Sequence, residues 1–189
     1  MTAQESALAH LTETLGRLGV PHMIIGGLAA AVWGEPRSTV DIDATVWVEE
    51  GEIPGVVAAL QKEFALLVAD PKSFIESTRV LPLRGRGGVR IDLVFGVLPF
   101  EEEAIRRALR RRIAAVEVPV CTAEDLILHK IVSDRPRDLE DVEGICRLRS
   151  AELDLGYLEP RIAELARLLD RPEIASRWSA WKRRWWRKD

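Results

Sequence analysis

The amino-acid sequence predicts an α/β (α+β) protein in which a short mixed sheet, flanked by helices, is followed by a helical C-terminal region. In the first two thirds of the chain, segments that alternate apolar and polar residues take turns with segments of helical periodicity. The remainder is helical in pattern, with breaks near Pro136, within residues 150–156 and near Pro172. We therefore expect an α/β core over residues 1–121 and, over residues 122–189, a helical region that completes a cleft.

The composition limits the class of protein. Hydrophobic residues make up 47% of the 189 residues, which is enough for a sizeable core. The net charge of -3 excludes a polycation that coats nucleic acid, so any basic surface must be local. Cys121 and Cys146 lack the spacing of a zinc site or a disulfide framework, and no apolar run approaches the ~20 residues that span a bilayer. We expect a cytoplasmic protein without a membrane partner.

The first elements are predicted from leucine spacing and a glycine pair. Residues 4–18 have the leucine periodicity of an amphipathic helix, and residues 21–25 are a short segment typical of a strand. Gly26 and Gly27 follow directly and open a compact helix over residues 28–33, which should be buried because it is apolar all round.

The next elements are predicted from strict alternation. Residues 39–48 alternate between an apolar face and a face that carries Asp41 and Asp43, which is typical of a half-buried strand. A helix near residues 53–64 follows. A hairpin is then predicted over about residues 78–95, with a glycine-rich turn.

Residues 99–113 are predicted to form a charged helix, and residues 116–120 a further strand. Glutamates lie at the start of this helix and three arginines at its end, a polarity that complements the helix dipole. We therefore interpret the arginine run at residues 110–112 as a solvated helix end rather than as an RNA-binding patch.

Asp41 and Asp43 are candidate metal ligands. Strand alternation directs both carboxylates to one side, with α-carbons roughly 7 Å apart. Two such carboxylates repel each other unless a cation lies between them, and hard oxygen ligands suit Mg2+ that also binds substrate phosphates. The alternative is a solvated polar face of an antiparallel strand.

Gly26 and Gly27 are candidate phosphate-binding residues. Glycine lets the backbone approach a ligand closely, and the N–H groups at the start of a helix attract anions. The alternative is an ordinary tight turn. Together, the glycine pair and Asp41 and Asp43 indicate a site for a triphosphate, which the backbone would hold at one end and a bound metal would bridge at the other.

Asp92 is the third candidate carboxylate. In residues 89–95 the apolar side chains share one face, and Asp92 lies on the other face together with Arg90. Beside a metal-bound pair, Asp92 would complete a two-metal site and accept a proton from an attacking hydroxyl. The alternative is an ion pair with an arginine across the hairpin.

Lys130 lies on the apolar stripe of a predicted helix that is capped by Thr122. A lysine that points inward needs an anionic partner, which is either a nucleotide phosphate or, as the simpler alternative, Asp134 at i+4. Asp138 and Asp141 share an inward face of the next helix. They form either a second wall of an active cleft or a structural ion network.

Together these residues resemble the signature of the minimal nucleotidyltransferase fold, the DNA polymerase beta-like superfamily, over about residues 20–145. That signature consists of a Gly-Gly or Gly-Ser pair, a spacer, Asp-x-Asp or Asp-x-Glu, and a third Asp on a later strand. Lys130 and the Arg-Asp-x-x-Asp sequence of residues 137–141 are similar to motifs of the AbiEii/AbiGii/MenT-type toxin branch.

The resemblance implies transfer of a nucleoside monophosphate from an NTP to an acceptor, with Mg2+ or Mn2+ as cofactor. Asp41, Asp43 and Asp92 would bind the metal and act in catalysis with Lys130. The residues that would hold the nucleotide are Gly26, Gly27, Arg37, Thr39 and Lys130, with Asp138 and Asp141 supporting Lys130.

The acceptor that the resemblance favours is RNA, in some members of the branch the 3′ end of tRNA, which would make the protein a toxin-like enzyme. A protein hydroxyl, as in nucleotidylating antitoxins, and a small molecule such as an aminoglycoside are alternatives, as is a nucleotide-binding module without turnover. A cognate antitoxin or toxin is a further candidate partner. Both a monomer and a dimer agree with the sequence.

Four of the six tryptophans lie in the last residues of the chain. Three of them, Trp178, Trp181 and Trp185, continue a helical stripe with Ile174 and have basic residues around them. A terminal helix docked on the core is favoured over a basic, aromatic surface for single-stranded RNA. Trp186 lies off the stripe, so we expect this tryptophan to be exposed.

Overall fold

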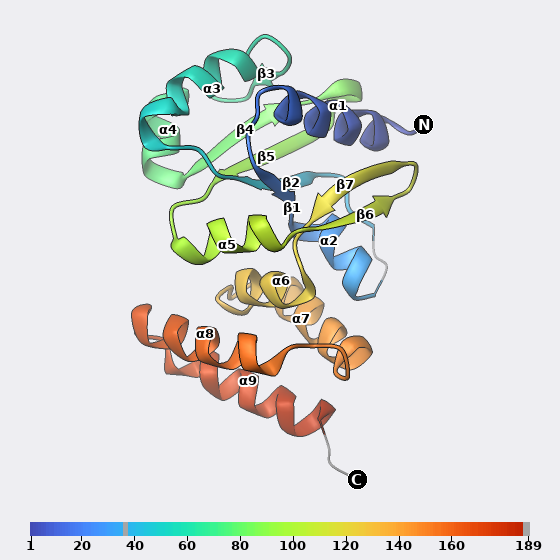
Figure 1. Cartoon of the computed structure of the whole chain (residues 1–189), viewed down its shortest axis with the longest axis vertical. Coiled ribbons are helices and arrows are strands. Elements are labelled where there is room, and N and C mark those ends of the chain that lie inside the picture. The colour runs from blue at the N-terminus through green and yellow to red at the C-terminus, as the bar shows by residue number, and fades with distance from the viewer. Residues whose placement is uncertain (36–37, 187–189) are drawn as a thin grey trace. The chain divides into compact units, whose positions relative to one another are not determined.

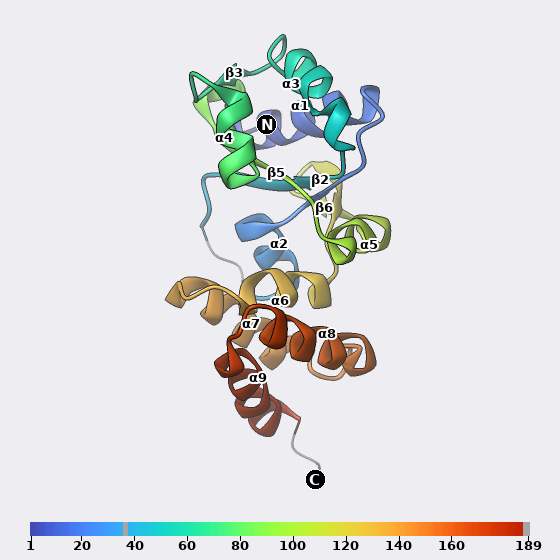
Figure 2. The same cartoon turned by 90° about the vertical axis from the view of Figure 1, so that its left-hand side faces the viewer.

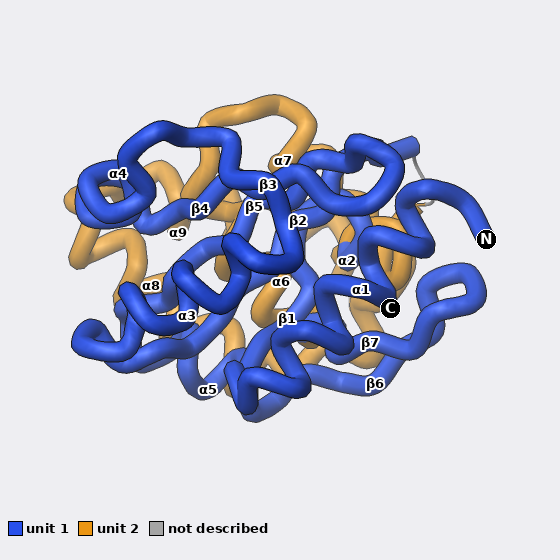
Figure 3. The backbone as a smooth tube through the Cα atoms, turned by 90° about the horizontal axis from the view of Figure 1, so that it is seen from above, with its two compact units in different colours: residues 1–29, 38–121 blue, residues 30–37, 122–189 orange. Residues whose placement is uncertain are grey.

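A computed structural model describes residues 1–35 and 38–186 of the chain. The chain divides into two compact units, one formed by residues 1–29 and 38–121 and the other by residues 30–37 and 122–189 (Figure 3). The first unit contains the sheet and the second unit is helical.

The first unit is built on a mixed sheet with the strand order β3-β4-β5-β2-β1-β7-β6 (Figure 1). The pairs β2–β5 and β1–β7 are parallel, and the other neighbours are antiparallel. The α/β (α+β) fold class with a mixed sheet is therefore confirmed. The strands are β1 (His22–Ile24), β2 (Ile42–Val46), β3 (Ala65–Leu66), β4 (Val80–Arg84), β5 (Arg90–Phe95), β6 (Leu109–Ile113) and β7 (Val116–Val120).

Alternation along the central strands buries one complete face of the sheet. Ile42, Ala44 and Val46 of β2 are fully buried, as are Ile91 and Leu93 of β5. Apolar side chains at every second position place the core against this face, and the intervening polar residues point to the other. The pattern therefore directs the predicted carboxylates away from the core face.

Helices cover both faces of this sheet. Figures 1 and 2 show α1 (Ala3–Arg17), α3 (Ile53–Leu60) and α4 (Pro71–Thr78) on one face and α5 (Pro99–Arg107) on the other. Helix α1 begins with a capping box, in which Thr2 and Glu5 satisfy each other's backbone N–H groups. The predicted helix near residues 53–64 ends earlier, at Leu60, and neither β3 nor α4 was expected.

The prediction of one helix over residues 99–113 is wrong. Helix α5 ends at Arg107 because Ala108 leaves the helical region, with φ -53° and ψ 136°. The next five residues form β6, which pairs antiparallel with β7 through a turn at Ala114, where φ is +51°. The arginines at residues 110–112 therefore lie on an edge strand, and it is Arg106 and Arg107 that face the negative end of the helix dipole.

The glycine pair opens a helix earlier than predicted. Helix α2 (Gly26–Trp33) begins at Gly26 itself, directly after β1. Strand β2 is shorter than the predicted segment of residues 39–48, and Val40, which was assigned to its apolar face, is 73% exposed. The strand, turn and helix unit is otherwise as expected.

The second unit consists of residues 30–37 and a helical C-terminal region. Its helices are α6 (Ala123–Ile131), α7 (Pro136–Arg149), α8 (Leu155–Leu168) and α9 (Pro172–Trp185), with α6 packed on α7 and α8 on α9. Proline at the start of α7 and α9 supplies the fixed φ of a first helical turn, so the breaks fall where they were predicted. Among the described residues, no helix has the length and apolar character needed to cross a membrane.

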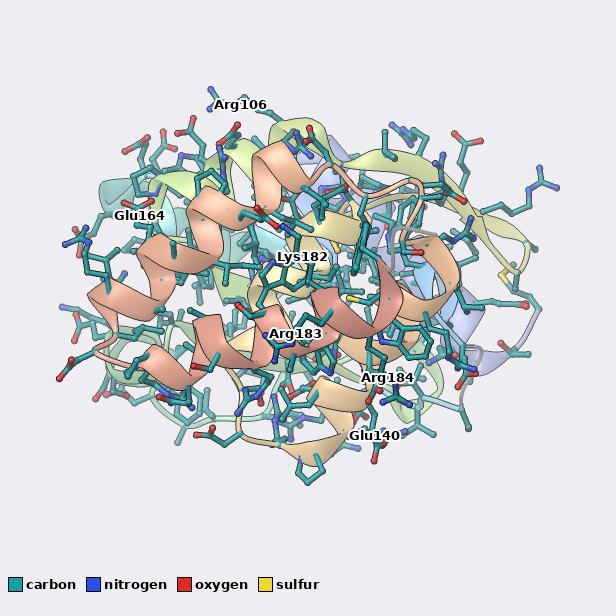
Figure 4. All side chains as sticks on the ribbon, turned by 90° about the horizontal axis from the view of Figure 1, so that it is seen from below. Arg106, Glu140, Glu164, Lys182, Arg183 and Arg184 are labelled. Atoms are coloured by element: carbon teal, nitrogen blue, oxygen red, sulfur yellow. The ribbon has the colours of Figure 1, made fainter. Side chains whose placement is uncertain are left out.

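The tryptophan stripe of α9 is docked rather than exposed. Trp178 and Trp181 are buried, and Trp186 packs its ring against Trp178 with centroids 5.6 Å apart. The expectation that Trp186 is exposed is wrong, because the chain turns at the end of α9 and returns this ring to the stripe. Two of the cations on α9 are Lys182 and Arg184, which are labelled in Figure 4. Lys182 pairs with Glu159 of α8, and Arg184 pairs with Glu143 of α7.

Candidate active site

Gly26 packs directly against the carboxylate-bearing strand β2. The N–H of Ile25 donates to the carbonyl oxygen of Asp43 at 2.9 Å, which holds the end of β1 beside Asp43. Gly26 has φ +63°, and a Cβ at this residue would lie 2.6 Å from Cγ and 2.7 Å from Cβ of Asp43. Only glycine fits here, because a side chain would both strain the backbone and displace the carboxylate.

This contact brings a helix start to a carboxylate. The first N–H groups of a helix have no partners within the helix, and they lie at the positive end of its dipole. Gly26 and Gly27 are the first residues of α2, so their N–H groups belong to this set. The structure therefore combines an anion-attracting helix end with Asp43 within the first unit.

Asp43 and Asp92 are direct neighbours across the parallel pair β2–β5. Their α-carbons are partners in the register, and adjacent strands are about 4.8 Å apart. Asp41 is the residue immediately before β2 and, like Asp43, is half-buried. Asp43 and Asp92 thus lie on two adjacent strands, and Asp41 directly precedes one of them.

Arg90 neutralises part of this charge. Its Nε donates to both oxygens of Asp92, at 3.1 and 3.0 Å, and its Nη2 lies 2.9 Å from Oδ1. The hydrogen bond and the charge of Asp92 raise the pKa of Arg90, and the charges of Asp41 and Asp43 add to this effect. The predicted alternative of an ion pair is therefore present, although the arginine belongs to the same strand and not to the strand across the hairpin.

The residues present fit a divalent cation that is bound partly by substrate. Within residues 1–35 and 38–186, no group of three or more His, Cys, Asp and Glu side chains is placed to hold a metal ion. Mg2+ is commonly bound by one or two protein carboxylates together with phosphate oxygens of the substrate. Asp41 and Asp43 can supply the carboxylates. Asp92 becomes a third ligand only if its ion pair with Arg90 opens.

Two further predicted nucleotide-binding residues precede β2. The carbonyl oxygen of Thr39 accepts a hydrogen bond from Nε2 of Gln4 at 3.0 Å, which ties this segment to α1. The Thr39 side chain is half-buried. Arg37 lies outside the described residues.

Lys130 is held in a buried clamp within the second unit. Its ammonium group lies 2.6 Å from Oδ1 of Asp138 and 2.9 Å from Oδ2 of Asp141, and the residue is only 6% exposed. Ser133 donates its hydroxyl to Asp138 at 2.7 Å. The simpler alternative, an ion pair with Asp134, is wrong, because Asp134 pairs with Arg171.

The clamp sets the ionisation of Asp138. Burial would raise its pKa, but hydrogen bonds from Lys130 and Ser133 and the charges of Lys130 and Arg135 outweigh burial and hold the pKa below its ordinary value. Asp138 is therefore charged at neutral pH. Inward lysine and inward carboxylates meet as predicted, with α6 supplying the lysine and α7 the acids.

One buried polar cluster was not predicted. Asp125, which is fully buried, accepts hydrogen bonds from the hydroxyls of Thr122 at 2.7 Å and Tyr157 at 2.6 Å. Thr122 also accepts from the N–H of Asp125, so the predicted cap at this helix start is present. The sequence signal was the acid at the third position of a capped helix, but the partner in α8 was not indicated by any local pattern.

Several solved structures resemble most of the chain in fold. An antigenic nucleotidyltransferase-like protein from Paracoccidioides brasiliensis is 17% identical, with 94% of this chain and 93% of that chain covered and a TM-score of 0.52. ANT(2")-Ia in complex with adenylyl-2"-tobramycin is 16% identical, with 94% and 99% covered and a TM-score of 0.56. The lincosamide antibiotic adenylyltransferase LnuA with bound lincomycin is 12% identical, with 77% and 98% covered and a TM-score of 0.52.

No curated protein matches the chain. The profile of one protein family, described as a nucleotidyltransferase of unknown function (DUF6036), matches residues 3–187. This range includes both units, and the fold of the solved structures agrees with it. The chain therefore belongs to the DUF6036 family of nucleotidyltransferases.

Proposed function

We propose that this nucleotidyltransferase moves a nucleoside monophosphate from an NTP to RNA, with tRNA as the favoured acceptor and Mg2+ or Mn2+ as cofactor. The observation that carries the proposal is the packing of Gly26 against Asp43, beside Asp92. It joins a helix start that attracts phosphate to carboxylates that suit a divalent cation.

In the proposed reaction, the acceptor hydroxyl oxygen forms a bond to the α-phosphorus of the NTP. The bond from that phosphorus to the bridging oxygen breaks, and pyrophosphate leaves with the electron pair. Asp92, once released from Arg90, accepts the hydroxyl proton, while Gly26 and Gly27 direct backbone N–H groups at the phosphates. When bound to Asp41 and Asp43, the metal would supply charge stabilisation to the phosphates.

Lys130 is proposed to contact the nucleotide phosphates, as in the toxin branch that its motif resembles. Asp138 and Asp141 hold its ammonium group in one position, which supports a role for them in positioning. Arg37 and Thr39 are proposed to contact the nucleotide as well. Assignment to the AbiEii/AbiGii/MenT-type branch, and hence a toxin-like role with a cognate antitoxin, rests on the Lys130 and Asp-x-x-Asp motifs.

The proposal is tested by incubating the protein with Mg2+, each labelled NTP in turn and total tRNA. We expect label to be transferred to RNA by the wild type and to be lost in Asp41→Asn and Asp43→Asn. Glu49→Gln is a matched control, since Glu49 is an exposed acid in the loop that follows β2. A wild type that transfers no nucleotide to RNA, to protein or to small acceptors contradicts the proposal.

A small-molecule acceptor is the second candidate. It is favoured by the resemblance to ANT(2")-Ia, solved with an adenylylated tobramycin, and to LnuA, described as a lincosamide antibiotic adenylyltransferase. Analysis of the labelled product separates RNA, protein and small-molecule acceptors. Tight NTP binding that survives Asp41→Ala and Asp43→Ala, with no product from the wild type, would instead indicate a binding module.

A further inference from the structure

A dense group of arginines lies at the edge of the sheet in the first unit. Five of the seven residues in 106–112 are arginines, and three of them fall on β6, the last strand in the sheet order. The β6 residues from Leu109 to Arg112 are all exposed. This concentration of positive charge contrasts with the net charge of -3 for the chain.

Arg110 and Arg112 are not neutralised by neighbouring acids. Within the part of the chain that the structure describes, neither guanidinium lies within ion-pair distance of a carboxylate. Glu117 faces Arg112 across the β6–β7 pair without closing an ion pair. The α9 cations Lys182 and Arg184, in contrast, are paired with acids. Strand β6 therefore presents two exposed arginines, Arg110 and Arg112, that no carboxylate among the described residues neutralises.

The strand register places Arg110 and Arg112 on the sheet face that carries the candidate carboxylates. Arg110 pairs with Pro119, and Ile24 pairs with Val120, so the residue beside Pro119 is Met23. Met23 in turn pairs with Thr45, which is two residues from Asp43.

Residues in one transverse row of a sheet share a face, and so do residues two apart along a strand. Arg110 therefore lies on the face of Asp43 and of its partner Asp92, and Arg112 lies there too. From β2 to β6 there are three strand intervals, or about 14 Å across the sheet at roughly 4.8 Å each. Along the strands, Arg110 is offset from Asp43 by two residues and Arg112 by four, or about 7 and 13 Å. Met23 and Thr45 between them are buried, so a polyanion that reaches both the carboxylates and these cations would follow the edge of the sheet rather than its central strands.

We propose that Arg110 and Arg112 bind the phosphate backbone of an RNA acceptor whose terminal hydroxyl is presented to Asp41, Asp43 and Asp92. This inference rests on the proposed nucleotidyl transfer and names the surface that would recognise the acceptor. Arginine suits the role because its planar fork contacts phosphate oxygens in pairs and stays charged. Phosphate contacts position a strand without reading its sequence, so this surface would hold many RNAs in the same orientation.

Charged side chains on an edge strand also discourage pairing with other chains, and this offers a second explanation for the arginines. The double variant Arg110→Glu/Arg112→Glu separates the two roles, since glutamate keeps the edge charged but repels phosphate. A matched control is Lys62→Glu/Lys72→Glu, which makes the same change of four charge units on exposed residues of the first unit.

The experiment measures the binding of total tRNA at several salt concentrations, together with the binding of ATP and Mg2+ by calorimetry. We expect the Arg110→Glu/Arg112→Glu protein to bind tRNA roughly tenfold or more weakly near physiological salt. The slope of log K against log salt should fall by roughly 1.4, at about 0.7 per lost single-strand phosphate contact. The Lys62→Glu/Lys72→Glu protein should bind as the wild type does, and ATP binding should be unchanged in both.

The outcomes also separate this inference from the proposed function. Equal tRNA binding by the wild type and the Arg110→Glu/Arg112→Glu protein overturns the inference. If the wild type still binds ATP with Mg2+ in that case, the proposed donor site is unaffected by this result. Equal losses in both double variants overturn it as well, because they would reflect net charge alone. A wild type that binds tRNA but neither ATP nor Mg2+ contradicts the proposed transfer and not the RNA surface.

Discussion

At the scale of single residues, the contact of Gly26 with Asp43 ties the phosphate-binding candidate to the metal-binding candidate. A side chain cannot be added at residue 26 without displacing Asp43, because the backbone at the start of α2 lies against the Asp43 side chain. The position of Asp43 is also fixed by the hydrogen bond that its carbonyl oxygen accepts from Ile25. The geometry of the site is thus built into the backbone.

Gly26→Ala should therefore damage the site. A side chain at φ +63° costs about 1–3 kcal/mol of stability, and the added methyl group would push the Asp43 carboxylate aside. We expect ATP affinity with Mg2+ to fall by about tenfold or more, measured by calorimetry, with a lower midpoint of thermal unfolding. Gly55→Ala, in the interior of α3 with open space around its α-carbon, is the control and should not lose affinity.

Arg90→Gln should strengthen metal binding. The Arg90 guanidinium competes with a cation for Asp92, and the pair is partly exposed, with Arg90 at 51% and Asp92 at 26%. Exposed pairs contribute about 0.2–1 kcal/mol, so the dissociation constant for Mg2+ should fall by up to about fivefold. Arg84→Gln is the control, because Arg84 is exposed and lies opposite Arg90 on β4. Unchanged Mg2+ affinity in Arg90→Gln would show that Arg90 does not compete.

The sequence predicts the neighbourhood of these residues better than their pairing. Strand alternation predicts that Asp41 and Asp43 share a face and that Asp92 lies on the polar face of its own strand. The pairing of β2 with β5, which makes Asp43 and Asp92 neighbours, could not be predicted from alternation.

Which nearby carboxylate pairs with Arg90 depends on side-chain rotamers and on the neighbouring strands. Local periodicity in the sequence predicts neither of these. The same holds for Lys130, which pairs with Asp138 and Asp141 of the next helix and not with Asp134 at i+4.

At the scale of elements, the clamp at Lys130 joins α6 to α7. Lys130→Ala would leave Asp138 and Asp141 buried without their shared cation, at a cost of about 3–5 kcal/mol in the free energy of unfolding. Denaturant unfolding measures this loss. Lys72→Ala removes a lysine that is 82% exposed, and it should change stability by less than about 0.5 kcal/mol. Similar losses in the two variants would contradict the clamp.

The same clamp makes stability depend on pH. The pKa of Asp138 is lower in the folded state than in the unfolded chain, where an aspartate titrates near about 3.9. Its stabilising contribution is complete above that value and is lost as the pH falls through the lower, folded pKa. We expect the wild type to lose stability more steeply than Asp138→Asn as the pH falls below about 4. Parallel curves of unfolding free energy against pH would rule out this contribution.

Strand β6 shows why one element was mispredicted. Arginine is a good helix former, so residues 109–112 continue the apparent periodicity of α5 by propensity alone. Pairing with β7 supplies a ladder of backbone hydrogen bonds, and this pairing outweighs the local helix propensity of residues 109–112. The β4–β5 hairpin was predicted correctly because alternation and a glycine turn both indicate it. The short elements β3 and α4 have neither signal.

At the scale of the whole molecule, each unit contains one buried cysteine. Cys121 of the first unit and Cys146 of the second are both fully buried. Burial, with a smaller effect from the charge of Glu143, raises the pKa of the Cys146 thiol to about 12, so its reactive thiolate is scarce at neutral pH. The two thiols are therefore natural reporters of the opening of their own units.

We expect neither thiol to react with iodoacetamide in the folded protein at neutral pH, and both to react as denaturant unfolds the chain. Mass spectrometry of the labelled peptides follows the two residues separately. A short peptide that contains an accessible cysteine serves as the control for reagent activity. Rapid labelling of Cys146 without denaturant would contradict the packing of α7.

The division into units could be predicted only in part. A change of periodicity near residue 121 is visible in the sequence, and it is there that the chain passes from the first unit to the second. The inclusion of residues 30–37 in the second unit depends on contacts distant in sequence, such as the hydrogen bond from Arg149 to the carbonyl oxygen of Trp33. Local sequence patterns do not predict contacts between residues so far apart in the chain.

Helix α2 begins in the first unit with Gly26 and ends in the second with Trp33. A cut at residue 121 would therefore leave the second unit without a piece of its own interior, because Gly34 packs against Ile145 and Trp33 is only 9% exposed. The two halves of such a cut chain would behave as complementing fragments rather than as separable modules. Any exchange of one unit for that of another protein must therefore carry this helix across the junction.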